Sequence, residues 1–243
     1  MLSLIIYFVI GIGMLLFSKG KLMYLIEIYL DLPNVIIHEC GHALMAKLSF
    51  GSVRSVRFHL FPSVVMTKGA LGQAEVGNRG KIGEILTGLG GYVIQGLFFS
   101  LITYLAIIDK SIFILPLFLI IYLITNLIAT EKSFWQNSFL LLVVGFGFYL
   151  YKSNPEVLLT VYNSLDKITT VFYGWYALGL AHQIGIVLTL GNDESWDGYA
   201  LREYTYIPTI LWKVLFLIVL IGSYFSYYLI TNPLIVSNLL NLI

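Results

Sequence analysis

Long apolar stretches, separated by short polar connections, follow one another along almost the whole of this 243-residue chain. A transmembrane helix needs about 20 mainly apolar residues, and the apolar runs near that length predict seven candidate spans. The candidates are residues 2–17, 22–49, 85–108, 112–129, 134–151, 171–191 and 210–231. We therefore expect an all-α polytopic membrane protein with about six to seven transmembrane helices, built as a single membrane-embedded domain over residues 1–243.

One polar segment, residues 51–84, has a different pattern. Residues 56–60 alternate between apolar and polar side chains, and a period of two is typical of a strand. Residues 63–67 form a second extended run, which a turn separates from a third run over residues 70–76. The pattern therefore predicts a small β-hairpin or sheet within the 51–84 loop.

Three further features bear on the helices. The stretch 22–49 contains Pro33, so it either kinks or divides into an interfacial piece and a spanning piece. Residues 152–170 are expected to form a polar connection with some amphipathic helix, and residues 191–209 form a second polar segment. Basic side chains occur on both sides of the spans, and their concentration in the 51–84 loop favours a cytoplasmic position for it.

Composition supports the membrane interpretation. Hydrophobic residues make up 58% of the chain and charged residues only 11%, with a mean hydropathy of +0.88. A soluble domain of this length cannot bury so much apolar surface. The net charge of +1 gives no reason to expect a nucleic-acid partner. The single cysteine, Cys40, excludes an internal disulfide and a metal site built from several cysteines.

The polar residues with the clearest chemistry lie inside the second apolar stretch, where the chain reads His38-Glu39-Cys40-Gly41-His42. This is an HExxH motif. Each residue of a helix advances by about 100°, so His42 lies about 40° from His38 and one turn along, and both imidazoles can reach one ion. Glu39 lies about 100° from His38, where it can hydrogen-bond a water on the ion without ligating the ion.

Zn²⁺ is the cofactor that this motif predicts. Zinc accepts imidazole nitrogen and carboxylate oxygen in catalytic sites that leave one position for water. The bound metal lowers the pKa of that water, and Glu39 would accept its proton and later pass it to a leaving amine. Two histidines and a glutamate inside an apolar span are otherwise costly, which favours an ion site over ordinary polar residues at a helix end.

A third protein ligand has to come from elsewhere in the chain. His59 lies in the polar loop and His182 in an apolar run, and we interpret both as structural or interfacial histidines. Asp193 and Asp197 follow the sixth span and are better candidates. Asp197 is favoured, because Gly198 after it permits a backbone bend and because Asp193 lies in a polar trio that is easily left in water. Asp193 stays an alternative.

These residues resemble the site-2-type family of intramembrane zinc metalloproteases. The run His38–Leu44 looks like the HExGHAL helix of that family, and Trp196–Gly198 is similar to its Asp-Gly motif. The run Gly90-Gly91-Tyr92-Val93-Ile94-Gln95 resembles its glycine-rich span, which tends to carry Asn where this chain has Gln95. The run from Asp197 to Trp212 is similar to a compact bacterial branch of the family.

The chain also departs from the family pattern. The proline that usually precedes the Asp-Gly pair is absent, no inserted PDZ domain is visible, and the fourth and fifth spans are not covered by the matches. The resemblance implies that His38, His42 and Asp197 ligate zinc and that Glu39 is the general base. It also implies a multi-pass protein of a bacterial cell membrane whose substrates are transmembrane or membrane-proximal peptide segments.

A helical substrate has to unwind before attack, because its scissile carbonyl is hydrogen-bonded within the helix. An edge strand of the 51–84 loop, with Phe58 as the candidate contact, would hold the peptide extended. Asn192 and Gln95 are candidates for binding the substrate backbone, and the alternative for both is hydrogen bonding between helices. The alternative for the hairpin is a membrane-surface role.

Two other functions compete with an intramembrane zinc endopeptidase. One is a non-proteolytic binding or regulatory membrane protein that retains a protease-derived zinc site. The other is a transporter, for which repeat-related broken helices are expected and none is found in the sequence. The predicted partners are a membrane-protein or membrane-peptide substrate and the lipid bilayer, with no nucleic acid. The sequence does not indicate the oligomeric state.

Overall fold

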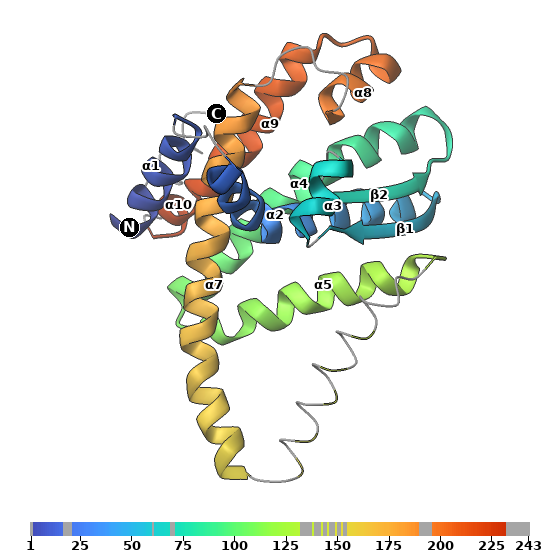
Figure 1. Cartoon of the computed structure of the whole chain (residues 1–243). Coiled ribbons are helices and arrows are strands. Elements are labelled where there is room, and N and C mark those ends of the chain that lie inside the picture. The colour runs from blue at the N-terminus through green and yellow to red at the C-terminus, as the bar shows by residue number, and fades with distance from the viewer. Residues whose placement is uncertain are drawn as a thin grey trace.

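The computed structural model describes residues 2–16, 21–59, 61–68, 71–131, 155–189 and 196–231, with the single positions 138, 142, 145, 149 and 152. Most of this part of the chain is helical (Figure 1). In chain order the elements are α1 (Leu2–Leu16), α2 (Lys21–Leu48), β1 (Ser52–Phe58), α3 (Pro62–Lys68), β2 (Gly72–Gly77), α4 (Gly80–Ile107), the 3₁₀ helix η1 (Ser111–Phe113), α5 (Ile114–Ile128), α7 (Pro155–Thr189), α8 (Asp197–Thr205), α9 (Thr209–Tyr224) and α10 (Ser226–Thr231).

Three of the described helical segments are long and apolar enough to cross a membrane. They are Gly80–Ile107, Ser111–Ile128 and Ser164–Thr189. Ser3–Leu15 and Thr209–Tyr224 are shorter apolar helices. The expected span 134–151 lies outside the described residues, apart from four single positions. A mainly helical protein with three candidate membrane spans among the described residues is therefore confirmed, and the number of six to seven spans stays a prediction.

The expected sheet in the polar loop is present as an antiparallel pair of strands. β1 pairs with β2 in a register that places Val56 opposite Ala74 and Phe58 opposite Gly72. The ladder continues for one residue beyond the strands, where the His59 amide donates to the carbonyl of Leu71 at 2.8 Å. The alternation of apolar and polar residues around Val56 therefore does mark a strand with one buried face.

The expectation of an extended run over residues 63–67 is wrong, because this segment is part of the helix α3. Pro62 is the first residue of α3, where its fixed φ angle suits a helix and its missing amide hydrogen is not needed. The amides of Val64 and Val65 both donate to the carbonyl of Phe61 and close the first turn. The strand propensity of the valines is overridden by this local start.

The outer edge of β1 is partly covered by the end of α5. The amides of Thr130 and Glu131 donate to the carbonyls of Val53 and Arg54 at 3.0 and 2.7 Å. The Glu131 carboxylate accepts a hydrogen bond from Arg54 at 2.7 Å and another from Arg57 at 3.1 Å. The hydrogen bond from Arg54 holds the pKa of the Glu131 carboxyl below its ordinary value. Within the described residues, β2 has no second strand on its outer edge.

Two helices differ in length from the expected elements. Residues 152–170 do not form a separate polar connection, because α7 runs without interruption from Pro155 to Thr189. Hydroxyl groups inside α7, such as those of Ser164 and Thr170, donate to carbonyls one turn earlier. Polar side chains are therefore satisfied within the helix itself. At the other end of the chain, the expected span 210–231 is divided into α9 and α10.

The central packing unit is formed by α2 and α4. α2 is one helix with Pro33 inside it, so the expected division into two pieces does not occur. A Cβ atom at Gly41 would collide with the carbonyl of Gly90, and a Cβ at Gly90 would lie 2.7 Å from the carbonyl of Gly41. The two backbones therefore touch where these glycines meet, as small residues allow between membrane helices. α7 packs against α1 and α2, and α9 packs against α4.

A buried ion pair joins α2 to α7. Asp31 is 5% exposed and His182 is 2% exposed. The two oxygens of Asp31 lie 3.0 and 2.9 Å from Nδ1 of His182. Nε2 of His182 is buried and has no hydrogen-bond partner in the part of the chain that the structure describes. The pair explains why two titratable side chains are tolerated between apolar helices, since each is matched by the other.

We predict that Asp31→Leu destabilises the protein by about 3–5 kcal/mol, because His182 is left buried without its partner. The double variant Asp31→Leu/His182→Leu should be closer to wild type in stability, since neither polar group remains. Thermal or denaturant unfolding in detergent measures both. A single variant as stable as wild type, or a double variant less stable than the single, would contradict this prediction.

Candidate metal centre

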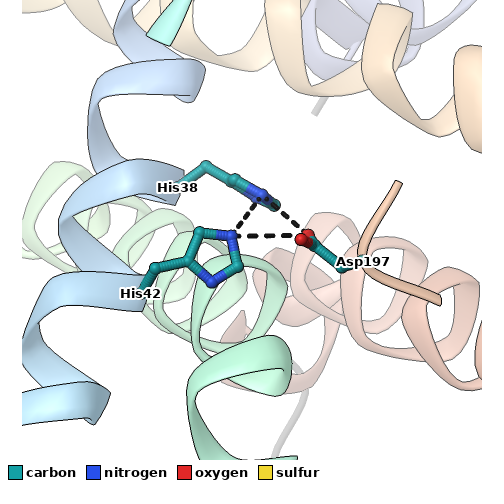
Figure 2. A group of neighbouring side chains, drawn as sticks. All are labelled: His38, His42 and Asp197. Carbon is teal, nitrogen blue, oxygen red and sulfur yellow. Dashed lines mark hydrogen bonds and ion pairs between the residues drawn. The ribbon is translucent and has the colours of Figure 1, made fainter. Parts of the chain in front are cut away.

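The helix α2 presents His38 and His42 on one face, as the HExxH spacing predicts. The two imidazoles lie one turn apart, edge to face, with ring centroids 4.6 Å from one another. Their side chains are largely removed from solvent, at 15% and 11% exposure. Figure 2 shows both rings directed toward the carboxylate of Asp197, which comes from the segment at the start of α8.

Asp197 is held at the first residue of α8. Trp196 precedes the helix with extended backbone angles, φ −117° and ψ 156°. Its indole ring is buried and packs edge-on against Phe216. A Cβ atom at Gly198 would collide with this ring. Gly198 is therefore required because it leaves space for Trp196, and not because of the expected backbone bend, since its φ angle is not in the left-handed region.

Three atoms from these side chains converge on one point. Nε2 of His42 lies 3.0 Å from Nε2 of His38. Oδ2 of Asp197 lies 3.1 Å from Nε2 of His38 and 3.4 Å from Nε2 of His42. Among the described residues, this is the only group of three or more His, Cys, Asp or Glu side chains that is close enough to share an ion.

The hydrogen-bond partners of the two Nδ1 atoms indicate which tautomer each imidazole adopts. Nδ1 of His42 lies 2.7 Å from the carbonyl oxygen of Thr87. A carbonyl only accepts, so in the neutral imidazole Nδ1 carries the hydrogen and Nε2 keeps its lone pair. Nδ1 of His38 lies 3.4 Å from Oε1 of Gln95, which favours the same arrangement. Two lone pairs and a carboxylate oxygen then face one another.

In these tautomers the three lone pairs repel one another unless a cation, either a metal ion or a proton, lies between them. Two neutral imidazole nitrogens and one carboxylate oxygen form a donor set that suits zinc and leaves a fourth position for water. The carbonyl of Thr87 and the amide of Gln95 are partners of the kind that orient ligating imidazoles. The residues present therefore fit the predicted metal.

Glu39 follows His38 in the sequence, but its carboxylate is not one of the three groups that converge. It is partly exposed and interacts electrostatically with His42. The start of β2 approaches it closely, since a Cβ atom at Gly72 would lie 2.8 Å from Cγ of Glu39. Phe58, opposite Gly72 in the sheet, packs its ring against Tyr122 at 5.9 Å. The hairpin and Glu39 therefore meet at one place.

The remaining candidates are placed as follows. The backbone amide of His59 extends the ladder of the sheet, and its imidazole is not part of the three-residue group. His182 is paired with Asp31, away from the group. Gln95 is fully buried. Asn192 and Asp193 lie outside the described residues, so the choice of Asp197 over Asp193 rests on the position of Asp197 alone.

Sequence reasoning did not identify three contributors from α4. The carbonyl of Thr87 could not be found from side-chain patterns, because every residue has a carbonyl group. Tyr92 packs edge-on against His38 with centroids 4.6 Å apart and stacks on Phe216. Gly91 lies directly under both imidazoles. Its place in the glycine-rich run from Gly90 to Gln95 gave no sign of contact with the histidines.

We predict that Gly91→Ala impairs metal binding. The added methyl would lie 2.5 Å from Cε1 of His38 and 2.7 Å from Nε2 of His42. Overpacking of this kind costs about 1–3 kcal/mol, which corresponds to about a 5- to 150-fold loss of zinc affinity. Competition with a chelator measures that affinity. Gly222→Ala on α9 is the control, because its Cβ would meet no atom within 4 Å. Equal zinc affinity in both variants would contradict the prediction.

Comparison with known proteins gives one finding that bears on this geometry. A family model described as Peptidase M50B-like matches residues 4–226. Searches of curated proteins and of solved structures found no match. The matched range contains all three residues of the convergent group, and the apolar helices agree with a membrane protease family. The chain therefore belongs to the Peptidase M50B-like family, the site-2-type protease family that its His38–Leu44 and Trp196–Gly198 motifs resemble.

Proposed function

We propose that this protein is an intramembrane zinc endopeptidase. It would cleave peptide bonds in transmembrane or membrane-proximal segments of other proteins, as a multi-pass protein of a bacterial cell membrane. The observation that carries the proposal is the convergence of His38, His42 and Asp197 beside Glu39. Family membership supports a metallopeptidase activity.

Each residue of the site has a distinct task in this proposal. His38, His42 and Asp197 hold zinc, which when bound supplies a Lewis acid and an acidified water. Glu39 does not ligate the zinc and accepts a proton from the attacking water. It then passes that proton to the amine that leaves when the peptide bond breaks. Gly91 keeps the space beneath the imidazoles open.

The substrate has to be extended at the point of attack, because a helical peptide bond is protected by its own hydrogen bonds. We assign its capture to the outer edge of β2. Residues that face each other in an antiparallel pair of strands alternate between pairs that are hydrogen-bonded to each other and pairs that are not. Since His59 bonds to Leu71 across the ladder, the backbone groups of Gly72 and Ala74 point away from β1. Gly72 also lies next to Glu39.

The opposite edge of the sheet is less suited to this task. Thr130 and Glu131 already occupy part of the outer edge of β1. Phe58, the contact expected from the sequence, packs toward Tyr122 on α5. A peptide that joined β2 would receive backbone hydrogen bonds from an edge strand and would reach the neighbourhood of Glu39. The proposed role of Phe58 is then to support Gly72 from the paired strand.

A non-proteolytic protein that retains the zinc site is the second candidate function. It would hold zinc through the same three residues, and it would differ only in the absence of cleavage. A transporter would instead show transport that depends on the polar residues of α2 and not on Glu39 as a base. Both alternatives are separated from the protease by the experiment on Glu39.

We predict that Glu39→Gln keeps zinc but abolishes cleavage, because the amide cannot accept the proton of the attacking water. Asp197→Ala should lose both zinc and cleavage. Elemental analysis of protein purified in detergent measures zinc per chain, and quantitative comparison of membrane peptides in cells with wild-type and Glu39→Gln protein measures cleavage. Undiminished turnover in Glu39→Gln would rule out the mechanism. Full zinc retention in Asp197→Ala would remove it from the ligand set.

A further prediction concerns substrate capture. Ala74→Pro removes an amide hydrogen that points away from β1, so the β1–β2 ladder is kept. If the substrate pairs with β2, Ala74→Pro loses one backbone hydrogen bond to it, and kcat/KM should fall about 2- to 10-fold. Ala74→Val retains the amide and serves as the control. Phe58→Pro removes an amide on the opposite edge. If Phe58→Pro slows cleavage and Ala74→Pro does not, with zinc content equal, the substrate pairs with β1.

A further inference from the structure

A network of three side-chain amides lies behind His38, on the side away from Asp197. Gln95 on α4 and Asn34 on α2 are both 0% exposed. Oε1 of Gln95 faces Nδ1 of His38 at 3.4 Å. Nε2 of Gln95 donates to Oδ1 of Asn34 at 3.2 Å and to Oε1 of Gln183 on α7. Both donors and the acceptor of the Gln95 amide are therefore engaged.

The orientation of this network is anchored by a main-chain group. Nδ2 of Asn34 donates to the carbonyl oxygen of Tyr176 at 3.0 Å. Because a carbonyl cannot donate, the amide nitrogen of Asn34 has to face Tyr176 and its oxygen has to face Gln95. The amide nitrogen of Gln95 must then face Asn34, and its oxygen must face His38.

The hydrogen-bond network also determines the tautomer of His38. An acceptor at Nδ1 of His38 requires a hydrogen on that nitrogen, which leaves the lone pair on Nε2. Nε2 is the atom that converges with His42 and Asp197. We propose that Gln95 is a positioning residue that selects the zinc-binding tautomer and ring orientation of His38, and that Asn34 acts on the metal site only through Gln95. This inference rests on the proposed zinc site.

The two ligating histidines are thus oriented by different means. His42 is oriented by a main-chain carbonyl, which no substitution removes. His38 is oriented by a side chain that can be replaced. Carboxylate, carbonyl and amide partners of ligating imidazoles typically change metal affinity by about 10- to 100-fold when they are removed. The proposal assigns Gln95 to the metal site and not to the substrate, so its effect should be measurable without substrate.

The test is a double-mutant cycle on zinc affinity in substrate-free protein. Gln95→Met, of similar length but without the amide, should weaken zinc binding about 10- to 100-fold. Asn34→Leu should weaken it less. The double variant should bind zinc as Gln95→Met does, because Asn34 has no independent route to His38. Gln95→Glu keeps the acceptor toward His38 but loses the two donors toward Asn34 and Gln183, so it should bind zinc more tightly than Gln95→Met without reaching wild-type affinity. The absorption spectrum of the Co²⁺-loaded protein should change in Gln95→Met.

Thr103→Val is the matched control. Thr103 is also buried on α4 and also hydrogen-bonds to α7, at 3.2 Å from the Tyr173 hydroxyl, but it does not contact His38. It should leave zinc affinity and the Co²⁺ spectrum unchanged. Wild-type affinity in Gln95→Met, or additive effects in the double variant, would overturn the inference. If Gln95→Met does not fold, wild-type zinc affinity in Asn34→Leu would by itself overturn the inference. Failure of wild-type protein to bind zinc would instead overturn the proposed function.

Discussion

The structure is organised around three electron-rich atoms that are held within 3.4 Å of one another, at Nε2 of His38, Nε2 of His42 and Oδ2 of Asp197. Without a metal ion or a proton between them these atoms repel one another, so the packing of the helices has to hold them together. The two histidines come from one helix, but Asp197 is 159 residues from His38. The proposed metal would therefore stabilise the folded arrangement as well as serve catalysis.

The helix α4 supplies most of what holds this arrangement. Its glycines allow α2 to approach until the backbones touch, and that contact brings other parts of α4 under the imidazoles. The Thr87 carbonyl then contacts His42, while the Gln95 amide and the Tyr92 ring contact His38. A longer side chain at Gly91 would separate these groups. The helix α4 therefore provides both the close packing against α2 and the groups that orient the two histidines.

The second organising feature is the polar face of α2. Asp31, Asn34, His38 and His42 follow one another at spacings of three or four residues, which places them along one side of the helix. Each has a partner on α4 or α7. In apolar surroundings an unmatched polar group is very costly, and a matched one fixes how the helices pack. The polar face therefore specifies which helices surround the proposed metal site and in what rotation.

Local patterns in the sequence were sufficient to predict a mainly helical protein, the strand around Val56 and the pairing of His38 with His42, because hydropathy and helical periodicity depend only on neighbouring residues. The residues after the sixth span and the family resemblance both favoured Asp197 as the third ligand, but its position beside the histidines depends on how distant helices pack. Only the tertiary structure showed that residues 63–67 are helical, that α7 begins at Pro155, and that the start of β2 reaches Glu39. The same is true of the contacts of Gln95 with His38 and of Asp31 with His182. Those contacts join residues that are 57 and 151 positions apart, and no local periodicity encodes a distance of that kind.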